Sequence, residues 1–302
     1  MRVLITGATG MLGTSLCDCF LRQGHDVYGL SRGNRVREPF SKEHRIEADI
    51  TDRKRIRQIT QEIHPELILH SAAISDVDYC EKVTQEAYRI NGEGTRTLAE
   101  ATDVCQARFC YISTDYVFDG ENPSPYREED PCRPLNVYGK SKLQGEEHTR
   151  AVCKHYVIIR TSWLFGENQD SFVHHVLEWA KTKTEIRLVS DKWSTPTYTP
   201  DLASSIYQLL DKGVPSGIYH VANGGVGCSW FDYGEKILAY RGLNHVPLIP
   251  MHLEALKRPA KRPPRSILSL EKFSKATGKE IRPWQEALKE YLTTVYTVPS
   301  KR

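Results

Sequence analysis

Short apolar runs alternate along the chain with stretches in which apolar residues recur every three or four positions. The runs have the length of buried strands and span residues 3–5, 27–30, 67–70, 109–112 and 156–160. Between the first two runs, Leu12, Leu16 and Phe20 share one face of a predicted helix. Because strands that alternate with helices form parallel sheets covered on both faces, we predict an α/β fold with a doubly wound, mostly parallel sheet.

Composition and charge indicate a globular protein. The chain has 302 residues, of which 39% are hydrophobic and 26% are charged, and its formal net charge is +3. This charge is too small to favour nucleic acid or an anionic membrane as a partner. No apolar run approaches membrane-spanning length and no basic-then-apolar leader precedes the first strand, so we expect a cytoplasmic protein.

The eight cysteines do not form a metal-binding or redox pattern. None of them falls in a Cys-x-x-Cys pair, and no histidine cluster accompanies them at the spacing of zinc sites. We therefore expect reduced thiols and no bound metal.

A glycine-rich segment follows the first predicted strand. Residues 6–13 read Thr-Gly-Ala-Thr-Gly-Met-Leu-Gly, with the spacing Gly-x-x-Gly-x-x-Gly. Glycines permit a tight turn and a close approach of the backbone to a ligand, and the free N–H groups that begin the next helix attract a pyrophosphate. We therefore predict dinucleotide contacts from Gly7, Thr9, Gly10, Met11 and Leu12.

Basic residues follow the second strand, where NAD sites usually carry an acidic residue. Arg32 comes directly after this strand, and Arg35 and Arg37 follow soon after it. Because an arginine accommodates the 2′-phosphate of the ribose, this pattern favours NADP(H) as the cofactor. Further cofactor contacts are predicted beyond the next two strands, at Asp49, Ile50, Ser71, Ala72 and Ala73.

Three side chains suited to proton transfer are predicted to converge where the strand at 109–112 ends. Thr114 lies at that carboxyl end, where α/β sheets bind ligands. Tyr138 and Lys142 are four residues apart on a predicted helix and share one face. A lysine cation favours a nearby phenolate, so we expect Lys142 to lower the pKa of Tyr138. We predict that all three are catalytic, and that Tyr138 and Lys142 also contact the cofactor.

Beyond residue 162 the pattern is less regular. Predicted helices and strands lie at 172–181, 187–190, 201–210, 218–221 and 284–295. We predict that residues 1–162 form a Rossmann domain that binds NADP, and that 187–222 return to it. Residues 163–186 and 223–302 would form a smaller, interleaved C-terminal α/β part that binds the substrate.

With these segments and several further motifs, the sequence resembles the extended short-chain dehydrogenase/reductase superfamily, and within it the dTDP-4-dehydrorhamnose reductase family. The similarity covers nearly the whole chain. The motifs that carry it are residues 6–13, 113–118, 134–139, 160–163, 191–197, 217–220 and 262–268. Of these, the Ser-Thr-Asp-Tyr-Val-Phe run that begins at Ser113 is far more specific than the glycine loop.

The resemblance implies an NADPH-dependent reduction of a nucleotide-diphospho-4-keto-6-deoxysugar, such as dTDP-4-dehydro-L-rhamnose to dTDP-L-rhamnose. Tyr138 would give a proton to the 4-keto oxygen and Thr114 would orient that oxygen. Lys142 would hold the nicotinamide ribose and lower the tyrosine pKa. Substrate contacts would come from Asp115, Tyr116, Trp163, Arg262 and Arg265. A homodimer is possible.

The chain departs from the family pattern in two places. Members usually carry Asp-Gln-x-Gly-x-Pro-Thr, whereas this chain has Lys192 in place of the glutamine and Trp193-Ser194 after it. The preference for sugar or nucleotide is therefore open. Some members also carry a glutamate in the first helix that helps to bind Mg²⁺ at a dimer interface; here Thr14-Ser15 occupy that region, so no metal is carried over.

Two other functions fit parts of the sequence. The segment Tyr126 to Asp130 also resembles the regulatory β subunit of methionine adenosyltransferase, a non-enzymatic protein of the same fold. The motifs at 160–163 and 262–268 follow the reductase pattern instead. An epimerase or dehydratase with tightly held NAD is the second alternative, and Arg32 argues against it because such sites favour an acidic residue there.

Overall fold

A seven-stranded sheet in the order β11-β6-β5-β4-β1-β2-β3 forms the centre of the protein, and every pairing in it is parallel. The computed structural model describes residues 1–33, 44–168 and 170–294. The strands of this sheet are β1 (Arg2–Thr6), β2 (Asp26–Ser31), β3 (Arg45–Glu47), β4 (Leu67–His70), β5 (Arg108–Thr114), β6 (Tyr156–Thr161) and β11 (Gly217–His220). The predicted doubly wound parallel sheet is confirmed.

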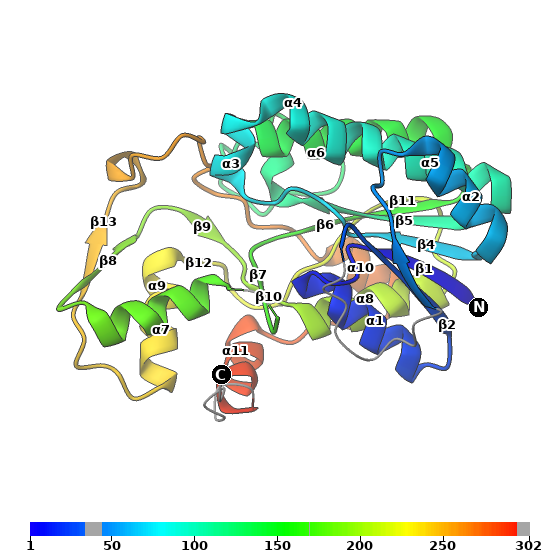
Figure 1. Ribbon diagram of the computed structural model, residues 1–302. Coiled ribbons are helices and arrows are strands. Elements are labelled where there is room, and N and C mark those ends of the chain that lie inside the picture. The colour runs from blue at the N-terminus through cyan, green and yellow to red at the C-terminus, as the bar shows by residue number, and fades with distance from the viewer. Residues whose placement is uncertain (34–43, 169, 295–302) are drawn as a thin grey trace.

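Helices cover both faces of the sheet, as Figure 1 shows. One face carries α1 (Met11–Arg22), α8 (Thr199–Asp211) and α10 (Glu271–Thr277). The other face carries α2 (Arg53–Ile63), α3 (Val77–Lys82), α4 (Thr84–Ala87), α5 (Thr95–Cys105) and α6 (Val137–Val152). Separate apolar clusters lie under the two layers, with Leu16 and Phe20 of α1 in the first and Ile56 and Ile59 of α2 in the second. The helical periodicities therefore mark the faces that pack on the strands.

A π-helical segment, Tyr88–Gly94, lies between α4 and α5 and joins them into one helical stretch. Asn91 lies inside this segment and is fully buried. Its Oδ1 accepts a hydrogen bond from the Ile74 backbone N–H at 2.8 Å, and its Nδ2 donates to the Ile74 carbonyl at 3.0 Å. The π-helical segment thus anchors the loop that follows β4 through the side chain of Asn91. A regular α-helix would place this residue at a different angle around the helix axis.

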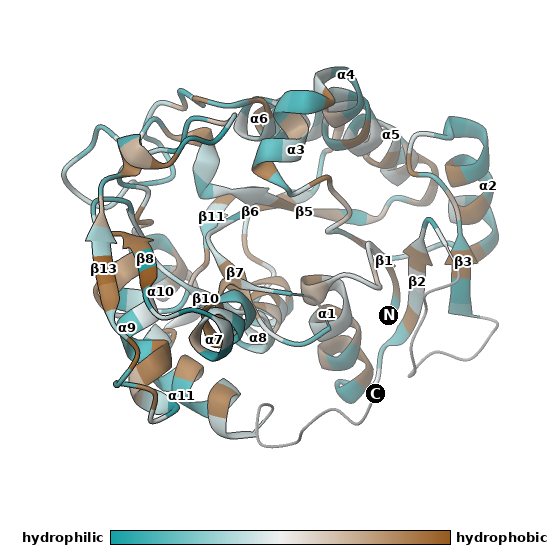
Figure 2. Ribbon diagram, turned by 60° about the vertical axis from the view of Figure 1, so that its left-hand side comes forward, coloured by the Kyte–Doolittle hydropathy of each residue, from teal (hydrophilic) through white to brown (hydrophobic). Residues whose placement is uncertain are grey.

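The C-terminal part of the chain builds a second, smaller body. It contains α7 (Phe172–Thr182), α9 (Trp230–Tyr240), α11 (Trp284–Thr294) and the short strands β7 (Leu164–Phe165), β8 (Ile186–Val189), β9 (Trp193–Ser194), β10 (Thr197–Tyr198), β12 (Cys228–Ser229) and β13 (Leu248–Met251). Figure 2 shows apolar residues along β8, β13 and the helices beside them. These elements share a core that includes Val176, Tyr233 and Leu288.

One strand lies outside the place expected for it. The predicted strand at 187–190 falls in the stretch expected to return to the Rossmann domain, but the observed strand β8 pairs in parallel with β13 in the second body. Ile186, Leu188 and Val189 are buried there against the C-terminal core rather than against the central sheet. The return to the central sheet is made by α8, which packs on α1, and by β11, which pairs with β6. The exact domain limits stay a prediction.

The order of strands reverses between β1 and β4, because the chain proceeds from β1 to β3 on one side and from β4 to β6 on the other. Ligands in open α/β sheets bind outside the carboxyl ends of the strands at such a point. The glycine loop, the segment Ser71–Ala73 and Thr114 all follow strands at this edge. Within the described part of the chain, no helix has the length and apolar content that crossing a bilayer requires.

Candidate active site

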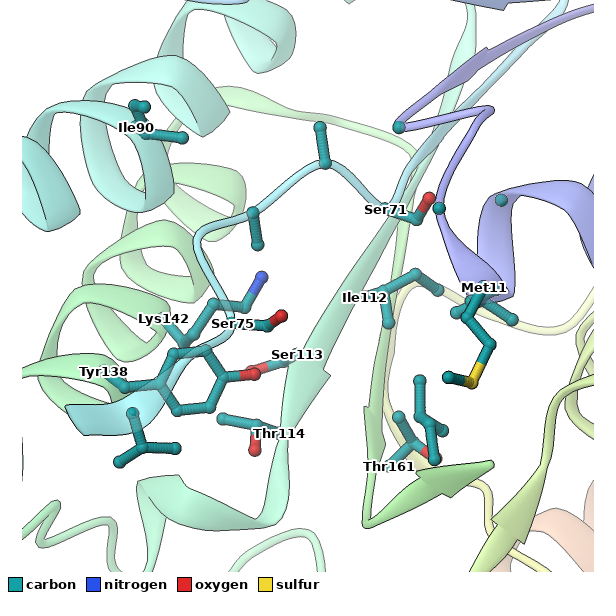
Figure 3. A pocket seen from close by; sticks show the side chains of 18 of the residues that line it. Met11, Ser71, Ser75, Ile90, Ile112, Ser113, Thr114, Tyr138, Lys142 and Thr161 are labelled. Atoms are coloured by element: carbon teal, nitrogen blue, oxygen red, sulfur yellow. The ribbon is translucent and has the colours of Figure 1, made fainter. Parts of the chain in front are cut away.

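A cavity of about 870 Å³ opens at the carboxyl ends of the central strands. One half is lined by the loops after β1, β2 and β4, and the other by the ends of β5 and β6 together with residues of the C-terminal body. In Figure 3, Tyr138 and Lys142 project from α6 towards Ser113 and Thr114, while Met11 and Thr161 lie across the cavity. The topology thus brings both predicted half-sites into one continuous space.

The glycine loop forms a cradle that side chains would fill. Gly7 has a φ of +69°, and a Cβ built on it would lie 2.8 Å from the Ala72 backbone nitrogen. A Cβ on Gly13 would overlap the Gly7 carbonyl oxygen. Gly10 precedes α1 without a side-chain cap, so the first-turn N–H groups of this helix face the cavity without an internal partner. This arrangement fits the pyrophosphate of a dinucleotide.

The predicted cofactor contacts lie where expected, with one exception. Gly7, Thr9, Gly10, Met11, Leu12, Arg32, Ile50, Ser71, Ala72 and Ala73 all line the cavity. Asp49 is not part of its wall. Its carboxylate instead accepts hydrogen bonds from the Thr51 N–H at 2.9 Å and the Thr51 hydroxyl at 2.8 Å. Burial would raise the pKa of Asp49, but these bonds and nearby arginines hold it below its usual value. Arg35 and Arg37 lie outside the described residues.

Thr114 and Tyr138 lie beside each other on the cavity wall. Thr114 is buried at the end of β5, and its hydroxyl is near enough to the Tyr138 phenol to favour the ionised phenol. Thr114 is held in place by the Tyr116 N–H, which donates to its Oγ1 at 3.2 Å. The Asn136 side chain caps α6 by accepting from the Gly139 N–H at 2.8 Å, which fixes where the helix begins and so where Tyr138 points. A ketone placed between these two hydroxyls would have a proton donor and a second hydrogen-bond donor on its oxygen.

The pKa of Tyr138 is raised, the reverse of the expectation from its spacing with Lys142. Burial of the phenol raises the pKa, and the nearby Thr114 hydroxyl opposes this only in part. Burial also lowers the pKa of Lys142 to about 7, against the opposing effect of Glu146. The prediction failed because spacing along a helix says nothing about desolvation. The phenol is therefore protonated at neutral pH, as a proton donor must be, although the raised pKa makes it a weaker acid in the absence of ligands.

A buried ion pair lies next to Lys142 on the same helix. Glu146, one turn after Lys142 on α6, is completely buried and forms a bidentate pair with Arg160 of β6, at 2.9 Å to Nε and 2.7 Å to Nη2. The Ser113 hydroxyl donates to the same carboxylate at 2.5 Å. The Lys142 ammonium lies over the ring of Tyr111, 4.2 Å from its centroid. These contacts fix α6 against β5 and β6 close to Lys142 and Ser113.

The second half of the cavity contains three of the five predicted substrate contacts. Asp115, Tyr116 and Trp163 line it. Trp163 has a φ of +46°, an unfavourable conformation for a bulky residue, and its ring packs on Phe172 and Tyr233. Strained backbone of this kind concentrates at ligand sites, where surrounding packing holds it.

The two predicted arginines do not line the cavity. Arg262 forms an ion pair with Asp78 at 2.7 Å, and its side chain is only 11% exposed. The backbone of Arg265 forms a parallel β-bridge with Trp193, and its Nε is buried without a hydrogen-bond partner among the residues that the structure describes. Arg262 and Arg265 therefore connect the C-terminal part of the chain to residues far from it in the sequence. A contact of either side chain with the nucleotide stays a prediction.

Several lining residues were not predicted from the sequence. They include Ser75, Ile90, Thr161, Asp170, Lys192 and Trp230. The hydroxyl of Thr161 is buried and has no hydrogen-bond partner in the described residues, which fits a polar ligand group in the cavity. From the sequence, Lys192 differs from the glutamine of the family motif, but this difference does not predict that its side chain lines the cavity. Trp230 begins α9, a helix that the apolar pattern did not reveal.

All eight cysteines are free thiols, as expected. Burial raises the pKa of Cys110, to about 12, and of Cys80, to about 11, so these thiols are not activated nucleophiles. The described residues contain no group of three or more His, Cys, Asp or Glu side chains placed to hold a metal ion. The absence of a metal from the intact protein stays a prediction.

Comparison with known proteins identifies the family. The model of the RmlD substrate binding domain family matches residues 1–297. The chain belongs to this family. It is 39% identical over 291 residues to the spore coat polysaccharide biosynthesis protein SpsK of Bacillus subtilis, which covers 96% of each chain. It is 37% identical over 300 residues to the dTDP-4-dehydrorhamnose reductase of Aggregatibacter actinomycetemcomitans, which covers 95% of this chain and 97% of the relative.

A solved structure of a similar protein has the same fold. The dTDP-4-dehydrorhamnose reductase of Bacillus anthracis, crystallised in complex with NADP, superposes with a TM-score of 0.87 at 36% identity. The match covers 97% of this chain and 98% of that one. The similarity therefore extends over the whole molecule, including both halves of the cavity.

The depressed pKa of Lys142 predicts a specific dependence of stability on pH. Between about 7 and about 10 the unfolded chain binds a proton at this lysine and the folded chain does not, so the free energy of unfolding rises with pH. Lys142→Met removes this effect and should flatten the rise by roughly 2–4 kcal/mol, with the greater gain in stability below pH 7. Urea unfolding from pH 6 to 9.5 measures it. Lys140→Met, exposed on the same helix, is the control; equal slopes for wild type and Lys142→Met would contradict the assignment.

The Glu146–Arg160 pair predicts a large loss of stability when one partner is removed. Glu146→Gln leaves a buried guanidinium without its counter-charge, so the free energy of unfolding should fall by about 3 kcal/mol. The neighbouring Glu147 is exposed on the same helix, and Glu147→Gln should change the free energy by less than about 0.5 kcal/mol. Equal values for the two variants in urea unfolding would show that the buried pair does not hold the site together.

Proposed function

We propose that this protein is an NADPH-dependent reductase of a nucleotide-diphospho-4-keto-6-deoxysugar, with dTDP-4-dehydro-L-rhamnose as substrate and dTDP-L-rhamnose as product. The observation that carries the proposal is the placement of Tyr138 beside Thr114 on the cavity wall, with Lys142 one helical turn after Tyr138. The chain as a whole is similar to dTDP-4-dehydrorhamnose reductases. Relatives with this name match over nearly their whole length.

The residues of the first half of the cavity fit a dinucleotide. The cradle of Gly7 and Gly13 accommodates a pyrophosphate, and Arg32 is exposed at the end of β2, where it would pair with a 2′-phosphate. The unpaired Thr161 hydroxyl would bond a polar group at the other end of the cofactor. When bound, reduced nicotinamide supplies the hydride that the carbonyl carbon accepts.

The protein's own residues then manage the proton. Tyr138 carries a proton at neutral pH, and it would donate this proton to the carbonyl oxygen. Thr114 would hold that oxygen beside the phenol with its hydroxyl. A protonated Lys142 would stabilise the phenolate that remains, because an opposite charge nearby favours the ionised form. Closure of the site by apolar walls would strengthen each of these interactions.

The alternatives lack comparable support. A regulatory subunit without activity has no need of a buried phenol beside a hydroxyl at the end of a ligand cavity, although it could bind NADP. An epimerase would hold NAD, and Arg32 at the end of β2 lines the cavity where such sites favour an acidic residue. The homodimer and the cytoplasmic location remain proposals from the sequence.

A direct assay tests the function. The purified protein is mixed with NADPH and with 4-keto-6-deoxy sugars linked to dTDP, GDP, CDP or UDP, and absorbance of the reduced nicotinamide is followed. We expect turnover, fastest with the dTDP-linked sugar, and a 4-hydroxyl product. No oxidation of NADPH with any of the four nucleotides would overturn the proposal. Stoichiometric capture of a synthetase partner without turnover would favour the regulatory alternative.

Arg32 sets the preference between the two cofactors in this proposal. Arg32→Ala removes a charged hydrogen bond to the 2′-phosphate, so kcat/KM for NADPH should fall by about 10- to 100-fold while kcat/KM for NADH changes little. Arg187→Ala, on the exposed face of β8, is the control. An equal fall with both cofactors, or no fall with NADPH, would place the 2′-phosphate elsewhere.

A further inference from the structure

A buried cation on the wall of the cavity has no part in the mechanism described above. Lys192 is only 2% exposed, yet it lines the second half of the cavity. Its ammonium lies 5.4 Å from the ring centroid of Tyr116 and 5.9 Å from that of Trp163. Both rings belong to the part of the cavity opposite the dinucleotide loop. Lysines are seldom buried unless they are paired, so the partners of this one are informative.

The partners of Lys192 form a short relay to a buried carboxylate. Its Nζ donates to the Ser266 hydroxyl at 3.2 Å, and Ser266 donates in turn to Asp115 Oδ2 at 2.5 Å. Ser194 donates to the same carboxylate oxygen at 3.2 Å. An ammonium has three N–H donors. Within the described residues, the bond to Ser266 is the one hydrogen bond of Lys192, so it has donors left for a ligand.

Asp115 connects this cluster to the catalytic residues. Its Oδ1 accepts a hydrogen bond from the Thr114 hydroxyl at 3.2 Å, and Thr114 lies beside Tyr138. Asp115 also lines the cavity and is 3% exposed. A carboxylate has more acceptor positions than the three protein hydroxyls occupy. The cavity wall beside the carbonyl site therefore presents a charged acceptor and a charged donor, bridged by one serine.

We propose that Lys192 is a specificity-determining residue that, together with Asp115, recognises a vicinal diol beside the substrate ketone. Asp115 accepts a hydrogen bond from one hydroxyl, and Lys192 donates to the oxygen of its neighbour. The inference deepens the proposed function and rests on it. In a 4-keto-6-deoxysugar, the hydroxyls on C2 and C3 form such a diol next to the reacting carbon. A sugar that lacks one of them would leave a buried charge without its partner, and such sites discriminate strongly.

The test compares substrates within each variant. Wild type and Lys192→Met are assayed with the dTDP-linked 4-keto-6-deoxysugar and with the analogues that lack the 2- or the 3-hydroxyl. Wild type should prefer the diol by at least about 100-fold in kcat/KM over one of these analogues. Lys192→Met should reduce that preference to less than about 10-fold, because it loses activity on the diol and not on the analogue. Lys192→Gln, which keeps an uncharged donor, should show an intermediate ratio.

Several outcomes would overturn the inference. A preference for the diol that stays at the wild-type value in Lys192→Met and Lys192→Gln would exclude a role in recognising it. A loss of inhibition by dTDP in the variants would assign Lys192 to the phosphates instead. The ratio of two substrates within one variant is independent of the fraction folded, and Lys140→Met controls for the loss of a lysine. Wild type that reduces none of the sugars would refute the proposed function, a result distinct from all of these.

Discussion

The packing of α6 against β5 and β6 is the constraint on which the site depends. Glu146 is buried between the layers and accepts hydrogen bonds from Arg160 and from Ser113, so one carboxylate joins the helix to two strands. The same helix carries Tyr138 two turns earlier. A hydroxyl at the end of β5 and a phenol on α6 meet only if helix and strand keep their register, and the buried pair holds this register from behind. The placement of Tyr138 beside Thr114 is therefore a consequence of packing that lies outside the cavity.

Burial gives the site its electrostatic character. Desolvation raises the pKa of Tyr138 and lowers that of Lys142 to about 7. In water the two groups have similar pKa values of about 10, whereas in this site the ammonium loses its proton far more readily than the phenol. A protonated phenol and a lysine that titrates near neutrality form a proton donor with an adjustable charge beside it. Perturbed groups of this kind concentrate at functional sites. Asp115, which accepts a hydrogen bond from Thr114, and Lys192 form a second pair of opposite charge. Burial raises the pKa of Asp115 and lowers that of Lys192.

Much of this structure could be predicted from the sequence because its signals are local. Buried strands produce apolar runs, α1 shows its packed face at Leu12, Leu16 and Phe20, and the glycine loop occurs directly after β1. In a parallel α/β sheet ligands bind at the carboxyl ends of the strands, so the segments at the ends of β1, β4 and β5 could be assigned to one site. The residues of the dinucleotide half of the cavity could be named for the same reason.

The parts that escaped prediction depend on contacts distant in sequence. The strand at 186–189 looks like any buried strand, and only its partner β13 decides to which body it belongs. Arg262 resembles a phosphate ligand, but Asp78, far earlier in the chain, already pairs with it. Lys192 reaches the cavity because the backbone of Trp193, the next residue, is hydrogen-bonded to Pro264 and Ser266. The spacing of apolar residues along the chain does not reveal this contact. The direction of the Tyr138 pKa likewise depends on three-dimensional burial.

The central claim is that the Tyr138 phenol provides the proton for carbonyl reduction. Tyr138→Phe removes the hydroxyl and leaves the glycine loop and Arg32 unchanged. In a single-turnover experiment with NADPH and the keto sugar in stopped flow, the account predicts unchanged binding of NADPH and a hydride-transfer rate at least about 100-fold slower than in wild type. Hydride transfer at the wild-type rate in this variant would contradict the account.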